Sequence, residues 1–346
     1  MKKTVLAAAA LSVACGATFA QSSVTVFGVV DLTLKSVKNG NTTINQLSNN
    51  GYSANQLGFR GIEDLGGGLK AGFWLESAIS PDVGTASATT DLSKFWSRRS
   101  TVSLIGNFGE IRLGRDLDPS YLNIAFDAFG NLGSGSSLNL ISTLGSGATT
   151  LVRSDNGVSY LLPAGILGGL YAHVTVAPGE GAVGTKYHAA RIGYAAGPVN
   201  ISAAFGNTGT ATTNDYKIAN IGGSYDFGVV KFLGLYNEAK YGALKQTVIG
   251  LGALVPVGPQ WQLRASAQRV NASGNTAGGV STNANDANLL AVGGVYFLSK
   301  RTQVYATAAK ITNKGAASYA VSTTPAGSLA MGSTSTGLDF GLRHSF

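Results

Sequence analysis

The sequence predicts an all-β protein, a 16-stranded antiparallel transmembrane β-barrel with a long third loop that folds inward. Three observations predict this fold class. Residues 1–20 have the form of an export signal, most of the remaining chain alternates apolar and polar residues, and no later stretch reaches about 18 uninterrupted apolar residues. Charged residues make up only 12% of the chain, whereas they form about a quarter of a soluble domain. An exported chain with few charges and no helical span favours a barrel.

The export signal, residues 1–20, begins with two lysines, continues as an apolar run and ends in small residues. This order predicts cleavage before Gln21, which leaves residues 21–346 as a single barrel domain. Cys15, the single cysteine, lies inside the signal. Ser12 stands where a lipoprotein signal has leucine, so a lipoprotein is the weaker alternative. The mature chain then has no cysteine, and we expect no disulfide framework.

Basic residues exceed acidic residues only modestly. Without the two lysines of the signal, the chain carries 23 basic and 17 acidic residues, spread along its length. Beyond the signal, the adjacent basic pairs are Arg98-Arg99 and Lys300-Arg301. A protein that binds nucleic acid gathers its basic residues in runs, so we expect no nucleic acid partner.

Period-two alternation marks strands from one end of the chain to the other. Near the start, residues 24–35 place valine and leucine on one face and Thr33 and Lys35 on the other. The same alternation recurs over 70–79 and over 303–308. Segments of about ten residues with one apolar and one polar face are typical of a transmembrane β-barrel, although each segment alone is weak evidence.

Connections between the predicted strands are of two kinds, which alternate along the chain. Seven short turns lie at 64–68, 107–109, 162–165, 196–198, 226–228, 255–259 and 298–301. Eight long polar loops lie near 38–53, 80–95, 117–150, 178–185, 207–215, 239–246, 271–287 and 312–334. These connections join sixteen strands and place both chain ends on the short-turn side. The last strand can then pair with the first, which avoids an open sheet edge in hydrocarbon.

The final predicted strand ends on Phe346, the last residue of the chain. Termini usually fray into solvent, so an apolar strand at the very end predicts a terminus that is ordered and paired. Aromatic residues form girdles at the rims of membrane barrels, and we expect Phe346 at the periplasmic rim. The apolar residues that share one face of this strand are Leu338, Phe340, Leu342 and Phe346.

Several stretches, taken together and in order, resemble a known family. They are GFRGIEDLGGGLKAGFWLE at 58–76, RRSTVSL at 98–104, LGR at 113–115, VRSDNGVSY at 152–160, SYDFG at 224–228, YFLSKRTQVY at 296–305 and the terminal GLRHSF. The combination is similar to the trimeric general porins of beta-proteobacteria, and the resemblance extends from the signal to the last residue. It implies a homotrimer in outer-membrane lipid and lipopolysaccharide, without a cofactor. It also implies that Phe346 is read by the outer-membrane assembly machinery.

The third loop, residues 117–150, is the predicted constriction of the channel. It carries many apolar residues for a solvated loop, so we expect it to fold inward and pack on the barrel wall, as the third loop does in the family. Its acidic residues are Asp118 and Asp127, and none lies in the Gly/Ser segment 133–137 that would form the tip. Cation-preferring relatives carry carboxylates at this tip. The loop of this chain lacks them.

Arginines are expected on the opposing wall. Arg60 shares a parity with Gln56, where the family commonly has a second arginine, and Arg153 matches an arginine of the family at the start of the sixth strand. Arg98 and Arg99 remain alternatives, because alternation favours Arg99 and the resemblance favours Arg98. The candidate constriction residues are Arg60, Lys70, Arg98, Arg99, Arg115, Asp116, Asp127 and Arg153.

Rings of basic side chains in a narrow throat select anions. We therefore expect passive diffusion of small hydrophilic solutes with a preference for small anions such as phosphate, sulfate or small carboxylates. The structural alternative is that a wall arginine only pairs with an aspartate or with loop carbonyls, as Arg153 could with Asp155. A substrate-specific channel for phosphate or an organic acid is a second alternative, although neither an aromatic track nor a dense basic ladder is evident.

An outer-membrane esterase is a less favoured alternative, because catalysis needs a nucleophile, a base and an orienting group close together. The three histidines, His173, His188 and His344, have no GxSxG setting and no metal-site spacing, so we expect rim positions and no metal. A secreted all-β lectin conflicts with the apolar outer faces. The enzyme and lectin alternatives are therefore set aside in favour of a channel.

Overall fold

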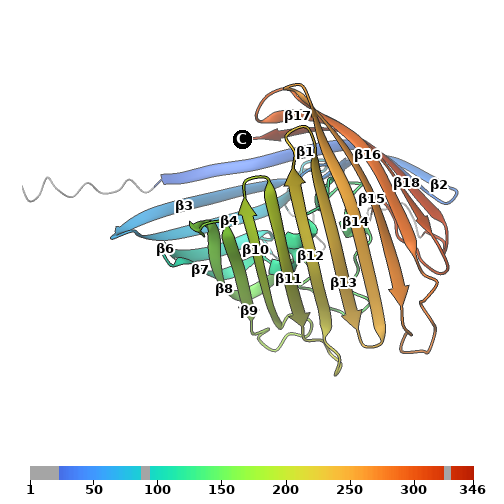
Figure 1. Ribbon diagram of the computed structural model, residues 1–346, viewed down its shortest axis with the longest axis horizontal. Helices are drawn as coiled ribbons and strands as arrows, with labels where there is room; N and C mark the ends of the chain where they lie inside the picture. Colours follow the sequence, from blue (N-terminus) through green and yellow to red (C-terminus); the bar gives the residue numbers. More distant parts are fainter. Residues whose placement is uncertain (1–22, 87–93, 323–328) are drawn as a thin grey trace, which may run out of the picture.

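The computed structural model describes residues 23–86, 94–322 and 329–346, and strands dominate it (Figure 1). The predicted signal, residues 1–20, lies outside the described residues. Two short helices, α2 (Pro119–Ile124) and η1 (Ser137–Asn139), lie between β7 and β8. The strands are β1 (Ser23–Asn39), β2 (Thr42–Asn49), β3 (Gln56–Gly66), β4 (Leu69–Ser80), β5 (Thr85–Ala86), β6 (Arg99–Gly106), β7 (Gly109–Leu117), β8 (Arg153–Leu167), β9 (Leu170–Ala177), β10 (Tyr187–Ala196), β11 (Val199–Thr208), β12 (Tyr216–Asp226), β13 (Lys231–Tyr241), β14 (Leu244–Val257), β15 (Trp261–Ser273), β16 (Ala287–Phe297), β17 (Thr302–Asn313) and β18 (Thr334–Ser345).

These strands build a closed antiparallel wall of sixteen strands. β2 and β3 act as one wall strand, because they pair with successive halves of β1. β5 is not a wall strand: it forms only two residue pairs with the end of β4. Within the wall, β4 pairs with β6. β18 pairs with β1 from Val29–Ser345 to Asn39–Ser335, so the sheet has no open edge there (Figure 1). The predicted fold class is confirmed.

The two chain ends meet at this seam. The backbone N–H of Phe346 donates to the carbonyl of Gly28 at 3.1 Å, and the N–H of Gly28 donates to the carbonyl of Phe346 at 3.1 Å. Both hydrogen bonds continue the β1–β18 ladder to the last residue. The predicted pairing of the C-terminus is therefore confirmed.

The wall strands have an apolar outer face, and their inner face is polar except where the third loop packs on it. On β18, Leu338 and Phe340 are 61% and 59% exposed on the outside, whereas Asp339 between them is 3% exposed inside. On β1, Leu34 faces outward and Thr33 and Lys35 are buried. The alternation follows from the strand geometry, in which successive side chains point to opposite faces.

Most predicted turns and loops lie where the structure has them, but three predictions were wrong. β8 continues through the predicted turn at 162–165 and ends at Leu167, where Gly168 and Gly169 have positive φ angles of 56° and 108°. The predicted loop at 239–246 is a tight turn centred on Gly242, and that at 38–53 is a hairpin turn at Gly40. Polar side chains led to the two loop errors, because backbone pairing does not depend on side-chain polarity, whereas Pro163 and Gly165 led to the error in β8.

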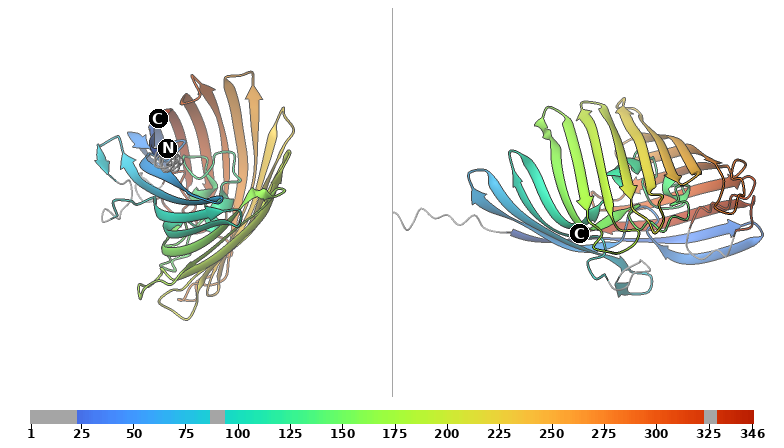
Figure 2. Two further views of the ribbon diagram at one scale, coloured as in Figure 1. Left: turned by 90° about the vertical axis from the view of Figure 1, so that its left-hand side faces the viewer. Right: turned by 90° about the horizontal axis from the view of Figure 1, so that it is seen from below.

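The third loop, between β7 and β8, folds inward and packs on the inner wall, as predicted. Helix α2 contacts β9 to β13, and the loop lies within the curve of the strands (Figure 2). Ile124, Phe129 and Leu140 of the loop are at most 4% exposed and belong to the main apolar cluster. The hydrophobic core therefore lies between this loop and one side of the barrel. No helix in the described part of the chain is long and apolar enough to span a bilayer.

Candidate pore constriction

Hydrogen bonds hold the third loop along the inner wall from β11 to β18. Near its start, the side-chain amide of Asn123 donates to the carbonyl of Ser202 on β11 at 3.0 Å. At its tip, the backbone N–H and hydroxyl of Ser134 donate to the carboxylate of Asp339 on β18 at 3.1 and 3.0 Å. The loop therefore lines one side of the lumen, and strands β3 to β8 supply the opposing side.

Both acidic residues of the loop are buried rather than directed at the lumen. Asp127 is 8% exposed and accepts hydrogen bonds from the N–H groups of Phe129 and Ser137 at 3.0 and 2.6 Å and from Gln268 at 3.2 Å. Burial raises the pKa of Asp127. Asp127 was expected at the constriction surface. It instead satisfies N–H groups where the loop turns, because such groups need an acceptor when they are buried.

Arg60 presents the least neutralised guanidinium of the opposing wall. It lies on β3, is exposed, and its guanidinium carbon lies 5.3 Å from the ring centroid of Phe27 and 5.0 Å from that of Trp74. Within residues 23–86, 94–322 and 329–346, Arg60 has no carboxylate at ion-pair distance. Aromatic rings thus position Arg60 without cancelling its charge.

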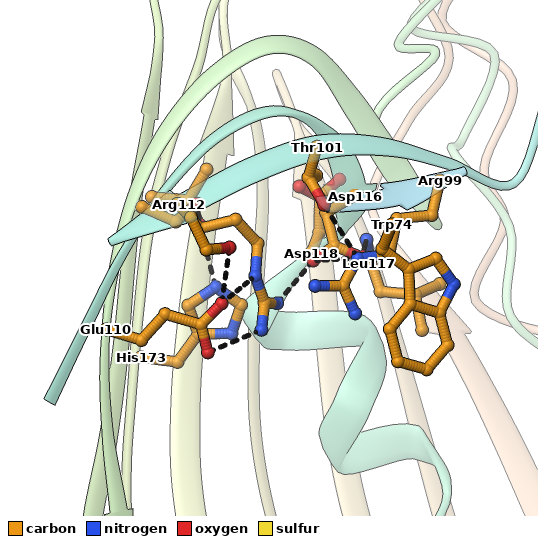
Figure 3. Close-up of polar contacts among 12 residues, drawn as sticks. Trp74, Arg99, Thr101, Glu110, Arg112, Asp116, Leu117, Asp118 and His173 are labelled. Carbon is orange, nitrogen blue, oxygen red and sulfur yellow. Dashed lines mark hydrogen bonds and ion pairs between the residues drawn. The ribbon is translucent and has the colours of Figure 1, made fainter. Parts of the chain in front are cut away.

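Arg98 and Arg99 both reach groups that line the lumen. Arg99, the first residue of β6, lies with its guanidinium 4.4 Å from the Trp74 ring centroid and 3.7 Å from Asp116 (Figure 3). Arg98 precedes the strand, and its side chain forms an ion pair with Glu76. Arg98 precedes β6, so the alternation of that strand does not determine where its side chain points. Both predicted alternatives, Arg98 and Arg99, can therefore lie at the lumen.

Arg112 is held between two carboxylates of its own strand, β7. Its guanidinium donates to Glu110 at 2.9 Å through two nitrogens and also pairs with Asp116 (Figure 3). Glu110 and Arg112 are not among the predicted constriction residues, although their period-two spacing in GEIRLGRDL could have revealed them. Asp116, a predicted constriction residue, therefore pairs with Arg112 and Arg99 together.

Arg115 and Arg153 lie near the base of the loop. Arg115 donates to the carboxylate of Asp155 at 2.5 Å, and Lys94 pairs with the same carboxylate at 2.7 Å. Arg153 donates to the backbone carbonyl of Arg98 at 2.7 Å. Arg153 therefore pairs with a loop carbonyl, which is one form of the structural alternative, whereas its pairing with Asp155 is not observed because Arg115 and Lys94 occupy that carboxylate.

Lys70 lies apart from this cluster, near the short-turn end of β4. Its register partners are Asp64 on β3 and Ile105 on β6, and its side chain is exposed. It shares a parity with Trp74, so it belongs to the lumen face of the wall. The structure places Lys70 at the mouth of the lumen rather than beside the loop.

Two further arginines, which are not among the predicted site residues, contact the loop. Arg191 on β10 donates to the side-chain oxygen of Asn123 at 2.6 Å. Arg264 on β15 is 6% exposed and lies 4.7 Å from the Tyr52 ring centroid and 4.6 Å from that of Phe129. Alternation of Arg264 with Ser266 and Gln268 marks it as inward-facing, but its contact with the loop needs the tertiary structure.

His173 differs from the expectation of a rim position. It is 4% exposed on β9, and its Nε2 lies 3.1 Å from the hydroxyl of Thr175 (Figure 3). His344, by contrast, lies near the chain end and contacts Thr302. In the part of the chain that the structure describes, no group of three His, Cys, Asp or Glu side chains is arranged to hold a metal ion.

Comparison with known proteins identifies the family. The model of the family described as Gram-negative porin matches residues 7–316. The chain belongs to the Gram-negative porin family. Outer membrane porin protein 32 of Delftia acidovorans is 36% identical to this porin over 367 residues, which cover both chains completely. An outer membrane porin protein of Bordetella pertussis is 27% identical over 88% of this chain and 93% of its own.

A solved porin shares the barrel of this chain. The anion-selective porin from Comamonas acidovorans superposes with a TM-score of 0.83 at 33% identity, covering 94% of this porin and all of the other chain. The fold and the family place this porin in the outer membrane of a Gram-negative bacterium.

Proposed function

We propose that this porin forms a water-filled channel for passive diffusion of small hydrophilic solutes and that it prefers small anions such as phosphate, sulfate or small carboxylates. The observation that carries the proposal is the charge around the lumen opposite the loop. The acidic residues there are Glu76, Glu110, Asp116 and Asp155. The basic residues are Arg60, Lys94, Arg98, Arg99, Arg112, Arg115 and Arg153.

The buried loop acids strengthen this imbalance. Asp118 and Asp127 would oppose anions if they faced the lumen, but they are 0% and 8% exposed. The excess of basic over acidic groups then acts on ions in a narrow throat, where charges are screened less than in bulk water. The similarity to a Comamonas acidovorans porin that is described as anion-selective supports the same preference.

The reversal potential under a KCl gradient in a planar bilayer tests this proposal. We expect chloride preference in the wild type and a reduced preference in Arg60→Ala and Arg153→Ala. Arg269→Ala is the matched control, because Arg269 is an exposed arginine on the outer face of β15. Cation preference of the wild type, or equal effects of the three substitutions, would contradict the proposal.

We further propose that the channel is a homotrimer without enzymatic activity, inserted in lipid and lipopolysaccharide by the assembly machinery that reads Phe346. Two apolar grooves of about 920 and 950 Å³ on the outer face support a subunit contact. The grooves lie over β13 to β18, β1 and β2. Small residues there, such as Ala306 and Ala308, let a second barrel approach closely. Mobility of the unheated protein on a gel tests the trimer.

A further inference from the structure

Three lysines lie side by side on the outer face of the barrel. Lys217 on β12 is directly opposite Lys240 on β13, and Lys240 is directly opposite Lys245 on β14. Each lies one residue inside the end of its strand, at the side of the long connections. Like charges directly opposite one another destabilise a sheet, so this row of lysines needs a counter-charge.

The protein supplies only part of that counter-charge. The carboxylate of Glu238 pairs with Lys240 and with Lys245 at 2.7 Å each, and the hydroxyl of Tyr236 donates to it at 3.1 Å. Lys217 has no ion-pair partner among the residues that the structure describes. A further carboxylate, Asp215, accepts a hydrogen bond from Asn207 at 2.8 Å. Three cations therefore face two carboxylates.

A pocket of about 600 Å³ opens beside this row, between β10 and β13. Its polar end is lined by His188, Asn207, Asp215, Lys217, Glu238 and Lys240. Its other end is apolar, because Phe205, which is 50% exposed, and Ala219 line it. The apolar end leads to Ile221, which is 55% exposed on the outer face of β12, so the pocket joins the surface that meets lipid tails.

We propose that this pocket binds the phosphate-bearing headgroup of a lipid in the outer leaflet. The long loops of outer-membrane barrels are extracellular, so the lysine row lies at the level of that leaflet. Lysines at a membrane surface attract anionic headgroups, and an ammonium binds phosphate as a point charge. The apolar end beside Phe205 favours a lipid over free phosphate, because it accommodates the first part of an acyl chain.

Binding of diphosphoryl lipid A to the full-length protein in detergent, followed by native mass spectrometry, tests the proposal. Lys217→Gln combined with Lys240→Gln should weaken binding by about 30-fold, because each interfacial lysine contributes about fivefold. Lys217→Arg combined with Lys240→Arg keeps the charges and should retain binding. The matched control is Lys38→Gln combined with Lys314→Gln, which removes two exposed lysines from β1 and from the loop after β17 and should leave binding unchanged.

Three results would overturn the proposal. Equal binding by the glutamine variant and the control would show that the lysine row is not involved. Equal binding of lipid A without its phosphates would show that only apolar contacts matter. Displacement of the lipid by inorganic phosphate at the same concentration would assign the pocket to free phosphate. Since the pocket lies on the outer face of the wall, none of these results depends on the ion selectivity of the pore.

Discussion

At the pore wall, Arg60 and Arg98 differ in how far their charges are neutralised. Among the described residues, the guanidinium of Arg60 lies beside two aromatic rings and no carboxylate, whereas Arg98 forms an ion pair with Glu76, which is 7% exposed. The indole N–H of Trp74 also donates to Glu76 at 2.9 Å. Glu76 therefore cancels one positive charge on the arginine side of the lumen.

Replacement of Glu76 by Gln should increase the preference for anions. It removes one negative charge and leaves Arg98 free to act on ions, while glutamine keeps an acceptor for Trp74. A unit charge about 8 Å from the ion path contributes roughly 0.5 kcal/mol in water, which changes a permeability ratio about twofold. Reversal potentials in a KCl gradient measure the change. A chloride-to-potassium permeability ratio that stays constant or falls would show that the charge of Glu76 does not oppose anions in the channel.

Asp118 is a buried carboxyl group at the start of the third loop. It is 0% exposed, its Oδ1 accepts a hydrogen bond from the hydroxyl of Ser154 at 2.7 Å, and its Oδ2 has no partner within the described chain. Burial raises the pKa of Asp118 from 3.8 to about 8. Between these values the folded chain holds a proton that the unfolded chain has lost, so stability falls as pH rises.

Asp118→Asn should remove this contribution, because asparagine does not ionise. We expect the variant to unfold at about the wild-type temperature at pH 4 and a few degrees higher at pH 9, corresponding to about 1–3 kcal/mol. Thermal unfolding at the two pH values measures the effect, with Asp226→Asn at the exposed end of β12 as the control. An unfolding temperature that differs from that of the wild type by the same amount at both pH values would contradict the raised pKa of Asp118.

At the scale of elements, the third loop is hydrogen-bonded to the inner wall at several points along its length. Its tip depends on one carboxylate, since Ser134 donates twice to Asp339. Lys35 lies 3.9 Å from the same carboxylate, and the side chains of Lys35 and Asp339 are 5% and 0% exposed. Asp339 thus links the loop tip, β18 and β1 in a buried polar cluster.

Asp339→Ala should loosen the tip of the loop. It removes two hydrogen bonds and takes the carboxylate away from the buried ammonium of Lys35, at a cost of about 3 kcal/mol or more. Single-channel recording should show a larger or less steady conductance than the wild type. The control is again Asp226→Asn, which changes an aspartate far from the loop. Unaltered, steady conductance in the Asp339 variant would mean that other contacts hold the tip.

At the scale of the whole molecule, closure of the sheet depends on the seam between β1 and β18. The hydrogen bonds between Phe346 and Gly28 extend this seam to the chain end, and the side chain of Phe346 is 47% exposed on the outer face. The last residue therefore has two possible roles, in the stability of the seam and in recognition during assembly.

Deletion of Phe346 should reduce the amount of folded protein in the outer membrane severalfold while leaving refolding of the purified chain in detergent largely intact. The loss of two hydrogen bonds at one end of a long ladder is a small cost, of about 1–3 kcal/mol. Heat-dependent gel mobility measures the folded fraction in both settings. Tyr194→Ala, which removes an exposed outer aromatic from β10 and lies outside the two proposed contact grooves, is the control. Equal losses in cells and in detergent would assign Phe346 to stability alone.

The sequence by itself determined the barrel, its number of strands and the faces of those strands. Strands that span a bilayer must close into a barrel, because every backbone N–H and C=O group there has to be hydrogen-bonded. Side chains alternate between the two faces of a strand, so the sequence alone assigns Leu338 and Phe340 to one face and Asp339 to the other. Arg60 and the inward fold of the third loop follow from the same local reasoning. The tight turns at Gly40 and Gly242 escaped it, because polar residues that pair in a sheet resemble those of a loop.

Only the tertiary structure decided which charges act on the lumen. Asp127 and Asp118 are acidic in the sequence but buried in the structure, and Arg115 rather than Arg153 pairs with Asp155. The row of Lys217, Lys240 and Lys245 likewise exists only once the register of β12 to β14 is known. The physical reason is that alternation along a strand is local, whereas ion pairs depend on the register between strands and on the path of the loop.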